Sequence, residues 1–558
     1  MLKIDYNHKK KKLIIECPYM LKDLIKELPE RKFSFARKVW EAPITRFNIA
    51  KLKEIKKSQD VKYTIQAEEA IEDFLKGPVF TNIPFPNGYT YMTEPFKHQK
   101  TFIDKYFNKN KIALFAEPGT GKSKMSLDML RAWYMASEID AAMIMCPSGL
   151  KLNYIEEIKK HFTQTDNIQI LKKGKTPIFT DGFKFLIVSI ESMSTGKGIY
   201  FEQVLSFLKA QRTALILDEA HYIKTPTSKR TKNIINEVAQ AADYKIAMTG
   251  TEVSEKVFDL FSIFFFLDPN IIGINDFYCF KHRYGVFGGY ENKQLIGYKN
   301  TNELFDNIRP YIYKIKKQEC LDLPDKIYTK VIIEPSKKFI QKYKEIVRTR
   351  VLELEGKETI MKPVVVALIT LLRQVCSGFY YDENKKAHLL YSDIDKNPKI
   401  IQLKTIIKSL HEKEQVIIWC SFVEEINIIQ KALEDYKIDY FNKSSVIYLG
   451  GLTDLEKEKR KNSFLDKECR YFIATMAAGG TGLTLNSSSN VIYFSTTYSH
   501  DKRKQSEDRN HRIGQVNKVH YTDLVMKNTI EERIQKSLQT KADLVDYVDQ
   551  QLRENNTI

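Results

Sequence analysis

Short apolar runs alternate with longer amphipathic segments along most of this 558-residue chain. Such runs, separated by helix-length spacers, are typical of parallel strands that are buried on both faces and joined by crossover helices. The first block of runs comprises residues 112–116, 142–146, 185–190, 214–217 and 245–248. The pattern returns at 416–420, 446–449, 471–475, 491–494 and 519–525, so the sequence predicts two α/β blocks.

The segments around these blocks predict the rest of the domain organisation. We expect a small basic α+β domain at 1–70, a linker rich in Pro, Gly and Asn at 71–92, a first lobe at 93–325 with a helical protrusion over about 256–325, a helical linker or protrusion at 326–395, a second lobe at 396–535, and a C-terminal helical tail at 536–558. The whole stretch 256–395 is expected to be mostly helical.

Composition excludes several classes of protein. A hydrophobic content of 43% is enough for several globular cores. The longest apolar run, 364–372, is far shorter than the roughly 20 residues of a membrane-spanning helix. The Lys-rich start lacks the apolar region of a signal peptide. We therefore expect a cytoplasmic protein without a membrane partner, and the Lys-, Ile- and Asn-rich usage is associated with bacterial or phage genomes.

The seven cysteines are scattered singly, and none lies in a Cys-x-x-Cys pair. Cys279 and His282 have a metal-like spacing, but no second pair completes four ligands. We expect reduced thiols and no structural metal.

The charge is strongly positive, since 88 Lys and Arg against 70 Asp and Glu leave +18. Residues 1–70 carry 17 basic and 10 acidic side chains, a net +7 in one eighth of the chain. This excess favours a nucleic-acid partner. The alternative, that a Lys-rich composition only serves solubility, remains open at this point.

A strand, a Gly-rich turn and a helix start follow one another at residues 111–123. Such a turn directs backbone N–H groups and the positive end of a helix at one point, which suits phosphate. Lys122 is placed to reach the β- and γ-phosphates, and the Ser123 hydroxyl to bind Mg²⁺. The expected nucleotide contacts are Gly119, Thr120, Gly121, Lys122 and Ser123. The full pattern has Gly where this chain has Ala116, so an ordinary Gly turn is the alternative.

An acidic pair follows the buried run 213–217. Ligands of open α/β sheets bind at the carboxyl ends of strands, where Asp218 and Glu219 lie. Asp218 is expected to hold Mg²⁺, and Glu219 to polarise the attacking water. A solvated acidic turn is the alternative. Together with the phosphate loop, the pair predicts Mg²⁺-dependent ATP hydrolysis.

Two motifs are very specific: Asp218-Glu-Ala-His221 and Arg509-Asn-His-Arg-Ile-Gly-Gln515. Their combination resembles the Swi/Snf-type branch of the superfamily 2 helicase-like ATPases, with a DEAH box. The resemblance covers roughly residues 90–535. Its further motifs are Phe96-Lys-His-Gln99, Cys146-Pro-Ser148, Thr249-Gly-Thr251, Leu323-Pro324, Leu372-Arg-Gln374 and Ala478-Gly-Gly-Thr-Gly482.

The resemblance implies two RecA-like parallel-sheet lobes, with ATP in the cleft between them and a nucleic-acid track across both. It also implies that Gln99 serves the adenine side of the nucleotide. Two positions depart from the family: Glu252 stands where Pro is usual, and Glu255 where Asn is usual. These departures bear on coupling between the lobes and leave the ATP chemistry unchanged.

The second lobe carries candidate cationic fingers. Arg509 and Arg512 are three residues apart, so we expect both on one helical face, directed at the charge that develops on the γ-phosphate. Gln505 is expected to hydrogen-bond the nucleotide or to link the lobes. Because about 390 residues separate Arg512 from Lys122, hydrolysis is expected to require lobe closure.

Nucleic-acid contacts are predicted at turns and helix starts. Pro147 and Ser148 begin a helix after a strand, and Gly480, Thr481 and the Ser421 region are similar turns in the second lobe. Backbone contacts of this kind follow phosphates and ignore base sequence. Ordinary turns would look the same, so the prediction depends on the order of the motifs.

Residues 24–43 resemble the small substrate-recognition module of annealing helicases. Arg31, Lys32, Arg37 and Lys38 are expected to contact phosphates. Phe33, Phe35 and Trp40 are expected either to form the core of a small strand pair or to stack on bases.

These features predict an ATP-dependent translocase on double-stranded or branched DNA, with fork remodelling or strand annealing as further activities. A strand-separating DNA or RNA helicase is one alternative. A nucleic-acid-binding adaptor with weak ATPase activity is another. The sequence indicates no particular protein partner.

Overall fold

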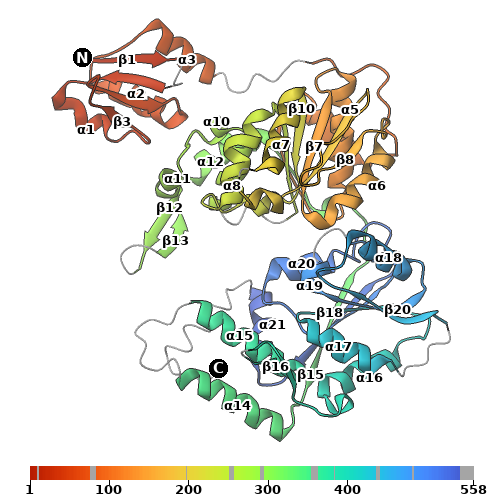
Figure 1. Cartoon of the computed structure of the whole chain (residues 1–558). Helices are drawn as coiled ribbons and strands as arrows, with labels where there is room; N and C mark the ends of the chain where they lie inside the picture. Colours follow the sequence, from red (N-terminus) through yellow and green to blue (C-terminus); the bar gives the residue numbers. More distant parts are fainter. Residues whose placement is uncertain are drawn as a thin grey trace. The chain divides into compact units, whose positions relative to one another are not determined.

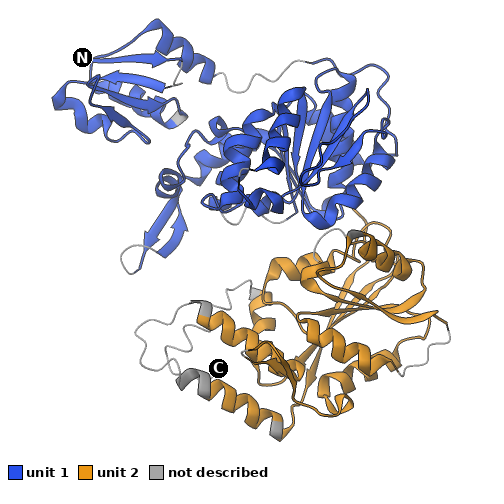
Figure 2. Cartoon of the chain, in the orientation of Figure 1, with its two compact units in different colours: residues 1–320 blue, residues 321–558 orange. Residues whose placement is uncertain are grey.

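The computed structural model describes residues 1–8, 12–75, 83–196, 198–250, 257–289, 294–352, 362–382, 384–434, 440–479 and 483–540. The chain divides into two compact units, Met1–Cys320 and Leu321–Ile558 (Figure 2). Among the described helices, none combines the length and apolar character that crossing a membrane requires.

The first unit begins with a five-stranded sheet whose strand order is β3-β4-β2-β1-β5. Its elements are β1 (Leu2–Asn7), β2 (Lys12–Glu16), α1 (Lys22–Ile25), β3 (Lys32–Ser34), β4 (Val39–Pro43), α2 (Arg46–Ser58), β5 (Val61–Tyr63) and α3 (Ile65–Leu75). Helix α2 starts where the Thr45 hydroxyl accepts a hydrogen bond from the Asn48 N–H at 2.9 Å. The predicted small α+β domain is confirmed.

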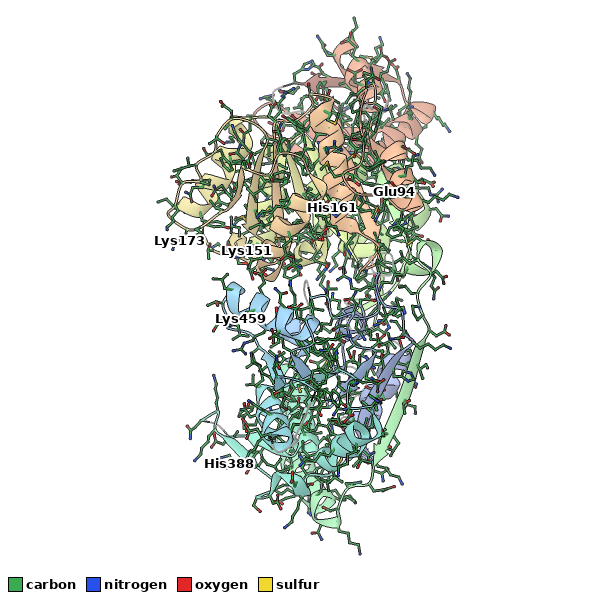
Figure 3. The ribbon with its side chains drawn as sticks, turned by 90° about the vertical axis from the view of Figure 1, so that its right-hand side faces the viewer. Glu94, Lys151, His161, Lys173, His388 and Lys459 are labelled. Atoms are coloured by element: carbon green, nitrogen blue, oxygen red, sulfur yellow. The ribbon has the colours of Figure 1, made fainter. Side chains whose placement is uncertain are left out.

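A seven-stranded, entirely parallel sheet follows, in the order β14-β6-β11-β10-β7-β9-β8 (Figure 1). Its strands are β6 (Lys111–Ala116), β7 (Ala141–Cys146), β8 (Ile168–Ile170), β9 (Lys184–Ser189), β10 (Thr213–Leu217), β11 (Tyr244–Thr249) and β14 (Ile312–Ile315). The connecting helices are α4 (Lys97–Tyr106), α5 (Lys122–Met135), α6 (Lys151–His161), α7 (Ile199–Ala210) and α8 (Lys229–Asn233). Figure 3 labels Lys151 and His161, the two ends of α6.

Both faces of this sheet are buried, which explains why its strands read as continuous apolar runs. Successive residues of β10 alternate between two cores: Leu215 and Leu217 pack in one, and Ile216 in the other. The insertion after β11 consists of α9 (Val257–Leu267), α10 (Pro269–Ile272), α11 (Phe277–Tyr284), the antiparallel pair β12 (Gly285–Gly288) and β13 (Gln294–Tyr298), and α12 (Thr301–Ile308); α13 (Lys317–Cys320) follows β14.

The second unit contains a six-stranded, entirely parallel sheet in the order β15-β22-β21-β18-β20-β19. Its strands are β15 (Lys326–Ile333), β18 (Val416–Cys420), β19 (Lys443–Tyr448), β20 (Cys469–Thr475), β21 (Asn490–Tyr493) and β22 (Val519–Met526). Its other elements are α14 (Lys337–Leu352), α15 (Lys362–Ser377), the pair β16 (Phe379–Tyr381) and β17 (Ala387–Leu389), α16 (Pro398–Ser409), α17 (Val423–Leu433), α18 (Asp454–Leu465), α19 (Met476–Gly479), α20 (His500–Glu507) and α21 (Ile530–Thr540).

The predicted α/β class with two parallel-sheet lobes is confirmed, and every predicted strand run coincides with a strand. The prediction for 256–395 was incomplete, because this stretch contains strands β12–β17 as well as helices. Two of them, β14 and β15, complete the large sheets. Residues 76–82 of the predicted linker and 541–558, most of the predicted C-terminal tail, lie outside the described residues, and 71–75 belong to the end of α3.

Candidate functional site

Three adjacent strands bring the nucleotide motifs to one edge of the first unit's sheet. Strand β11 pairs in parallel with β6 on one side and with β10 on the other. The turn after β6 and the start of α5 hold Gly119–Ser123, and the turn after β10 holds Asp218 and Glu219, so both sets lie at carboxyl ends of strands that flank β11. This edge is where open α/β sheets bind ligands.

Backbone conformation and close packing explain why the phosphate loop has glycine at 119 and 121. Gly119 and Gly121 both have φ near 86°, in the left-handed region, and Gly121 directly precedes α5. A Cβ on Gly121 would lie 2.3 Å from Nε2 of Gln99. The same Nε2 donates to the Thr120 carbonyl at 3.2 Å, and Oε1 of Gln99 accepts from the Phe96 N–H at 3.0 Å. Gln99 therefore supports the loop backbone, in addition to the adenine role that the resemblance implies.

Lys122 is held at the centre of the edge. Its Nζ donates to the Ala116 carbonyl at 3.0 Å, and a Cβ on Gly250 would lie 2.8 Å from the same nitrogen. The absent side chain at Gly250 thus leaves room for the ammonium group. The side chain is half-buried, which leaves its charge accessible to a phosphate placed over the loop.

Hydrogen bonds and backbone conformation fix the positions of Asp218 and Glu219. Asp218 is 6% exposed, and its Oδ1 accepts from the Glu219 N–H at 2.9 Å, while Glu219 has a left-handed φ of 51°. The Glu219 carboxylate lies 3.2 Å from Nδ1 of His221. Burial and the neighbouring charge of Glu219 raise the pKa of Asp218 to about 6, and the charge of Lys122 opposes this rise.

The donor set of this edge suits Mg²⁺. Magnesium prefers hard oxygen ligands and is typically bound by one or two carboxylates together with substrate phosphates. The Ser123 hydroxyl and the Asp218 carboxylate provide such oxygens, and the Tyr154 hydroxyl donates to Oδ2 of Asp218 at 2.9 Å. The residues present therefore fit the ion that the sequence predicts.

The arginines of the second unit lie outside a helix, contrary to prediction. Helix α20 contains the half-buried Gln505 but ends at Glu507, so Arg509 and Arg512 lie in the turns that follow, not on one helical face. Arg509 is 8% exposed, and Nη1 of Arg512 donates to Oγ1 of Thr484 at 2.8 Å. The helix stops here because the chain turns back to enter β22.

A buried ion-pair network supports the segment that carries these arginines. Arg503 donates from Nε to Glu507 at 2.9 Å and from Nη2 to Asp523 in β22 at 2.9 Å. Lys326 in β15 contacts the same Glu507 carboxylate at 2.9 Å. Removing one member of such a network would leave a buried charge without its partner. The network therefore anchors the end of α20 to two strands of the sheet.

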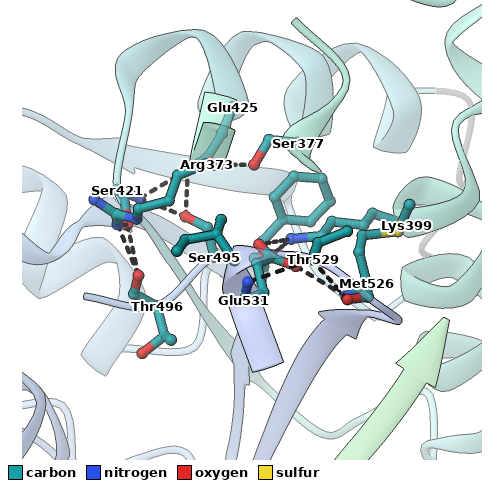
Figure 4. A network of polar contacts seen from close by, with 12 residues as sticks. Arg373, Ser377, Lys399, Ser421, Glu425, Ser495, Thr496, Met526, Thr529 and Glu531 are labelled. Carbon is teal, nitrogen blue, oxygen red and sulfur yellow. Dashed lines mark hydrogen bonds and ion pairs between the residues drawn. The ribbon is translucent and has the colours of Figure 1, made fainter. Parts of the chain in front are cut away.

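The predicted nucleic-acid contacts have internal partners in this structure. Ser148 lies in a short 3₁₀ turn before α6, and its N–H donates to Glu191 at 3.1 Å. The Ser421 N–H donates to Glu425 at 2.7 Å and to Ser495 at 2.9 Å, while its hydroxyl accepts from Arg373 (Figure 4). A phosphate at either serine would have to compete with these partners. Gly480 and Thr481, like Glu252 and Glu255, lie outside the described residues.

Glu425 is the centre of the contacts around Ser421. Its fully buried carboxylate accepts from the Ser421 and Phe422 N–H groups and from the Ser377 and Ser495 hydroxyls (Figure 4). These donors come from α15, from the start of α17 and from the segment after β21, so one side chain ties three parts of the unit together.

We expect Glu425→Ala to destabilise the second unit by about 3 kcal/mol or more, because it leaves several buried donors unsatisfied. Denaturant unfolding followed by tryptophan fluorescence measures this, since Trp419 is buried in the adjacent strand. Glu424→Ala is the control: the neighbouring Glu424 carboxylate accepts a surface hydrogen bond from Asn427 at 3.0 Å, and its loss should change stability by less than about 0.5 kcal/mol. Equal unfolding midpoints for the two variants would contradict the role of Glu425.

Strand β3 and its flanking residues carry four exposed basic side chains of the first domain. We call residues 31–38 the hairpin tip; the exposed cations on it are Arg31, Lys32, Arg37 and Lys38. Phe35 is 85% exposed and packs edge-on against Phe33 with ring centroids 5.1 Å apart, whereas Trp40 packs against the domain core. Of the two roles expected for the aromatic residues, Trp40 has the core role, whereas Phe35 is exposed and available for stacking on a partner.

The family follows from comparison with known proteins. A model of the SNF2-related domain matches residues 57–380, and a model of the helicase conserved C-terminal domain matches 398–514. The chain belongs to the SNF2-related family, and the family expected from the two specific motifs is confirmed.

The chain is distantly similar to several individual proteins of known sequence or structure. The chain is 26% identical over 515 residues to an uncharacterized ATP-dependent helicase of Mycoplasma genitalium, covering 89% of this chain and 45% of the relative. It is 26% identical to the putative ATP-dependent helicase/translocase YwqA of Bacillus subtilis, covering 60% of this chain and 35% of that protein. The chain thus spans less than half the length of both. The Sulfolobus solfataricus SWI2/SNF2 ATPase core in complex with dsDNA is 23% identical, covers 81% of this chain and 92% of its own, and has a TM-score of 0.36.

Proposed function

We propose that this protein is a DNA-dependent ATPase that uses ATP hydrolysis to move along double-stranded DNA. The observation that carries the proposal is the meeting of the phosphate loop, Lys122, Asp218 and Glu219 at one edge of a parallel sheet in an SNF2-related chain. The net charge of +18 supports a polyanionic track.

Each residue of the site has a distinct role in the proposed ATP hydrolysis. The N–H groups of Gly119–Ser123 and the start of α5 receive the phosphates, and Lys122 holds the β- and γ-phosphates. Ser123 and Asp218 would hold Mg²⁺, which when bound neutralises charge on the phosphate oxygens. Glu219, next to Asp218 but turned by its left-handed backbone, orients and deprotonates the attacking water. Arg509 and Arg512 supply positive charge to the transition state when the second unit closes on the nucleotide.

The discriminating experiment compares ATPase rates of the purified chain with double-stranded DNA, single-stranded DNA, forked DNA and RNA. We expect the greatest stimulation by double-stranded or forked DNA. Translocation is then measured by displacement of a third strand from a DNA triplex, and strand separation by release of a labelled strand from a duplex. Triplex displacement without duplex unwinding supports a translocase. Unwinding of the duplex supports the helicase alternative instead, and no stimulation by any nucleic acid rejects the proposal.

The hairpin tip is proposed to contact branched DNA, as its likeness to the annealing-helicase module suggests. Its cations are exposed on β3 and its flanking residues, beside the exposed ring of Phe35, a combination that suits phosphate contact with base stacking. Such contacts need no base sequence, so they suit recognition of DNA shape.

We expect the triple substitution of Lys32, Arg37 and Lys38 by Gln to weaken binding of forked DNA and to reduce the salt dependence of that binding. Each lost phosphate contact lowers the slope of log K against log salt by about 0.9, so the slope should fall by about two to three. Arg31 is left in place because it also hydrogen-bonds the Leu28 carbonyl.

The matched control substitutes Lys53, Lys56 and Lys57, three exposed lysines on α2 of the same domain, by Gln. It removes the same charge from another surface. Fluorescence anisotropy at several salt concentrations measures both variants. Equal slopes for the two would show that only the overall charge of the domain matters, and the hairpin tip would lose its assignment.

A further inference from the structure

One buried tyrosine contacts a side chain that is proposed to hold Mg²⁺. Tyr154 lies in α6, is 2% exposed, and donates from its hydroxyl to Oδ2 of Asp218 at 2.9 Å. Asp218 follows β10, whereas Tyr154 comes from the helix after β7, so the hydrogen bond joins two separate elements.

The fold explains how α6 reaches this place. Helix α6 follows β7, the parallel neighbour of β10, and it packs against α5, which begins at Lys122. Tyr154 is part of the core on that face of the sheet, where it packs with Ile144 and Ile216 in one cluster. Its ring is thus fixed by packing, and only the hydroxyl extends to the polar edge.

Two explanations of this hydroxyl are possible in principle, and the geometry distinguishes them. A buried tyrosine usually finds one partner for its O–H simply to avoid desolvation. A backbone carbonyl would serve that purpose, as it does for Tyr89, which donates to the Asp128 carbonyl at 3.1 Å. Tyr154 instead donates to the carboxylate of Asp218, a proposed metal ligand on a different element.

We propose that Tyr154 is a positioning residue that holds the Asp218 carboxylate in the orientation that Mg²⁺-nucleotide requires. The inference rests on the proposed function, because it takes Asp218 as a magnesium ligand. Partners that hydrogen-bond a metal ligand fix its orientation, and their loss typically costs 10- to 100-fold in metal affinity or activity. Tyr154 itself would contact neither the ion nor the nucleotide.

The test uses the full chain with Tyr154→Phe, which keeps the ring and removes only the hydroxyl. Binding of a fluorescent ADP analogue is titrated over a series of Mg²⁺ concentrations and in EDTA, so the readout needs no turnover. We expect the Mg²⁺ concentration for half-maximal enhancement of binding to rise about 10-fold. The dissociation constant in EDTA should change less than about twofold, because the phosphate loop itself is untouched.

Tyr244→Phe is the matched control. Tyr244 is also a buried tyrosine of the same sheet whose hydroxyl donates to a carboxylate, that of Glu138, but it begins β11 and so lies at the opposite edge. This variant should keep the wild-type Mg²⁺ dependence. Thermal unfolding of both variants checks that the fold is retained.

A double substitution tests whether Tyr154 acts through Asp218. In an Asp218→Ala background, Tyr154→Phe should shift the Mg²⁺ dependence much less than it does alone, because both changes disturb the same ligand. A wild-type Mg²⁺ dependence of Tyr154→Phe, or an equal loss of binding in EDTA, would overturn the proposal. A wild-type chain whose nucleotide binding ignores Mg²⁺ would instead reject the proposed function.

Discussion

Lys122→Ala is expected to reduce the rate of ATP hydrolysis by about 10²–10³ or more, to near the background of the assay. The ammonium group donates to the Ala116 carbonyl and lies in the space that Gly250 leaves open. Burial raises the pKa of the nearby Asp218 carboxyl, and the charge of Lys122 opposes that rise. Without it, the β- and γ-phosphates lose the point charge that holds them over the loop. Steady-state phosphate release with saturating DNA measures the effect.

Glu219→Gln provides the comparison that separates binding from chemistry. Glutamine keeps the shape of the side chain but cannot take a proton from water, so ATP should bind with near-normal affinity and remain unhydrolysed. Lys105→Ala, at an exposed position of α4, is the control for the loss of a lysine and should leave turnover unchanged. Near-normal hydrolysis by Lys122→Ala or Glu219→Gln would remove that residue from the catalytic assignment.

Arg512→Ala is expected to lower kcat by about 10³–10⁵ while nucleotide affinity changes only a few fold. A finger that meets the phosphate only in the closed state stabilises the transition state and contributes little to ground-state binding. In this structure the guanidinium donates to Oγ1 of Thr484, a residue of its own unit, at 2.8 Å. Single-turnover hydrolysis and equilibrium binding of a nucleotide analogue measure the two quantities separately.

The control for this variant is Arg460→Ala in the same unit. Arg460 is half-buried like Arg512, and it donates to the Ile447 carbonyl, but it lies on α18. It should retain most of the turnover. If Arg512→Ala weakens only ATP affinity and leaves kcat unchanged, Arg512 acts in binding and the finger belongs elsewhere, with Arg509 as the next residue to test.

The central strands were predictable because each is buried on both faces and therefore apolar throughout. The predicted run 416–420 coincides with β18, and Ile417 and Ile418 enter opposite cores. The edge strands β8 and β15 lack this property. In β15 the four consecutive residues 327–330 are exposed, so the strand lacks the continuous apolar run that marks the central strands. Its place becomes visible only through its pairing with β22.

The segment that carries Arg509 and Arg512 was also not predictable from sequence. A spacing of three residues suggests one helical face, but α20 ends at Glu507, before Arg509. Lys326 of β15 binds Glu507 and Asp523 of β22 binds Arg503, so tertiary contacts hold the end of this helix. The sequence contains no signal for the Lys326–Glu507 pair, since the two residues are 181 positions apart in the chain.

Sequence alone determined the class of fold, the phosphate loop and the acidic pair, because these depend on local requirements: glycine where φ is positive, and buried strands before a charged turn. Tertiary structure alone decided which side chains support them. Gln99 braces the phosphate loop, Glu425 occupies the donors of Ser421, and Tyr154 contacts Asp218. Each of these contacts joins separate elements, and a hydrogen bond between distant segments leaves no periodicity or motif in the sequence from which it could be predicted.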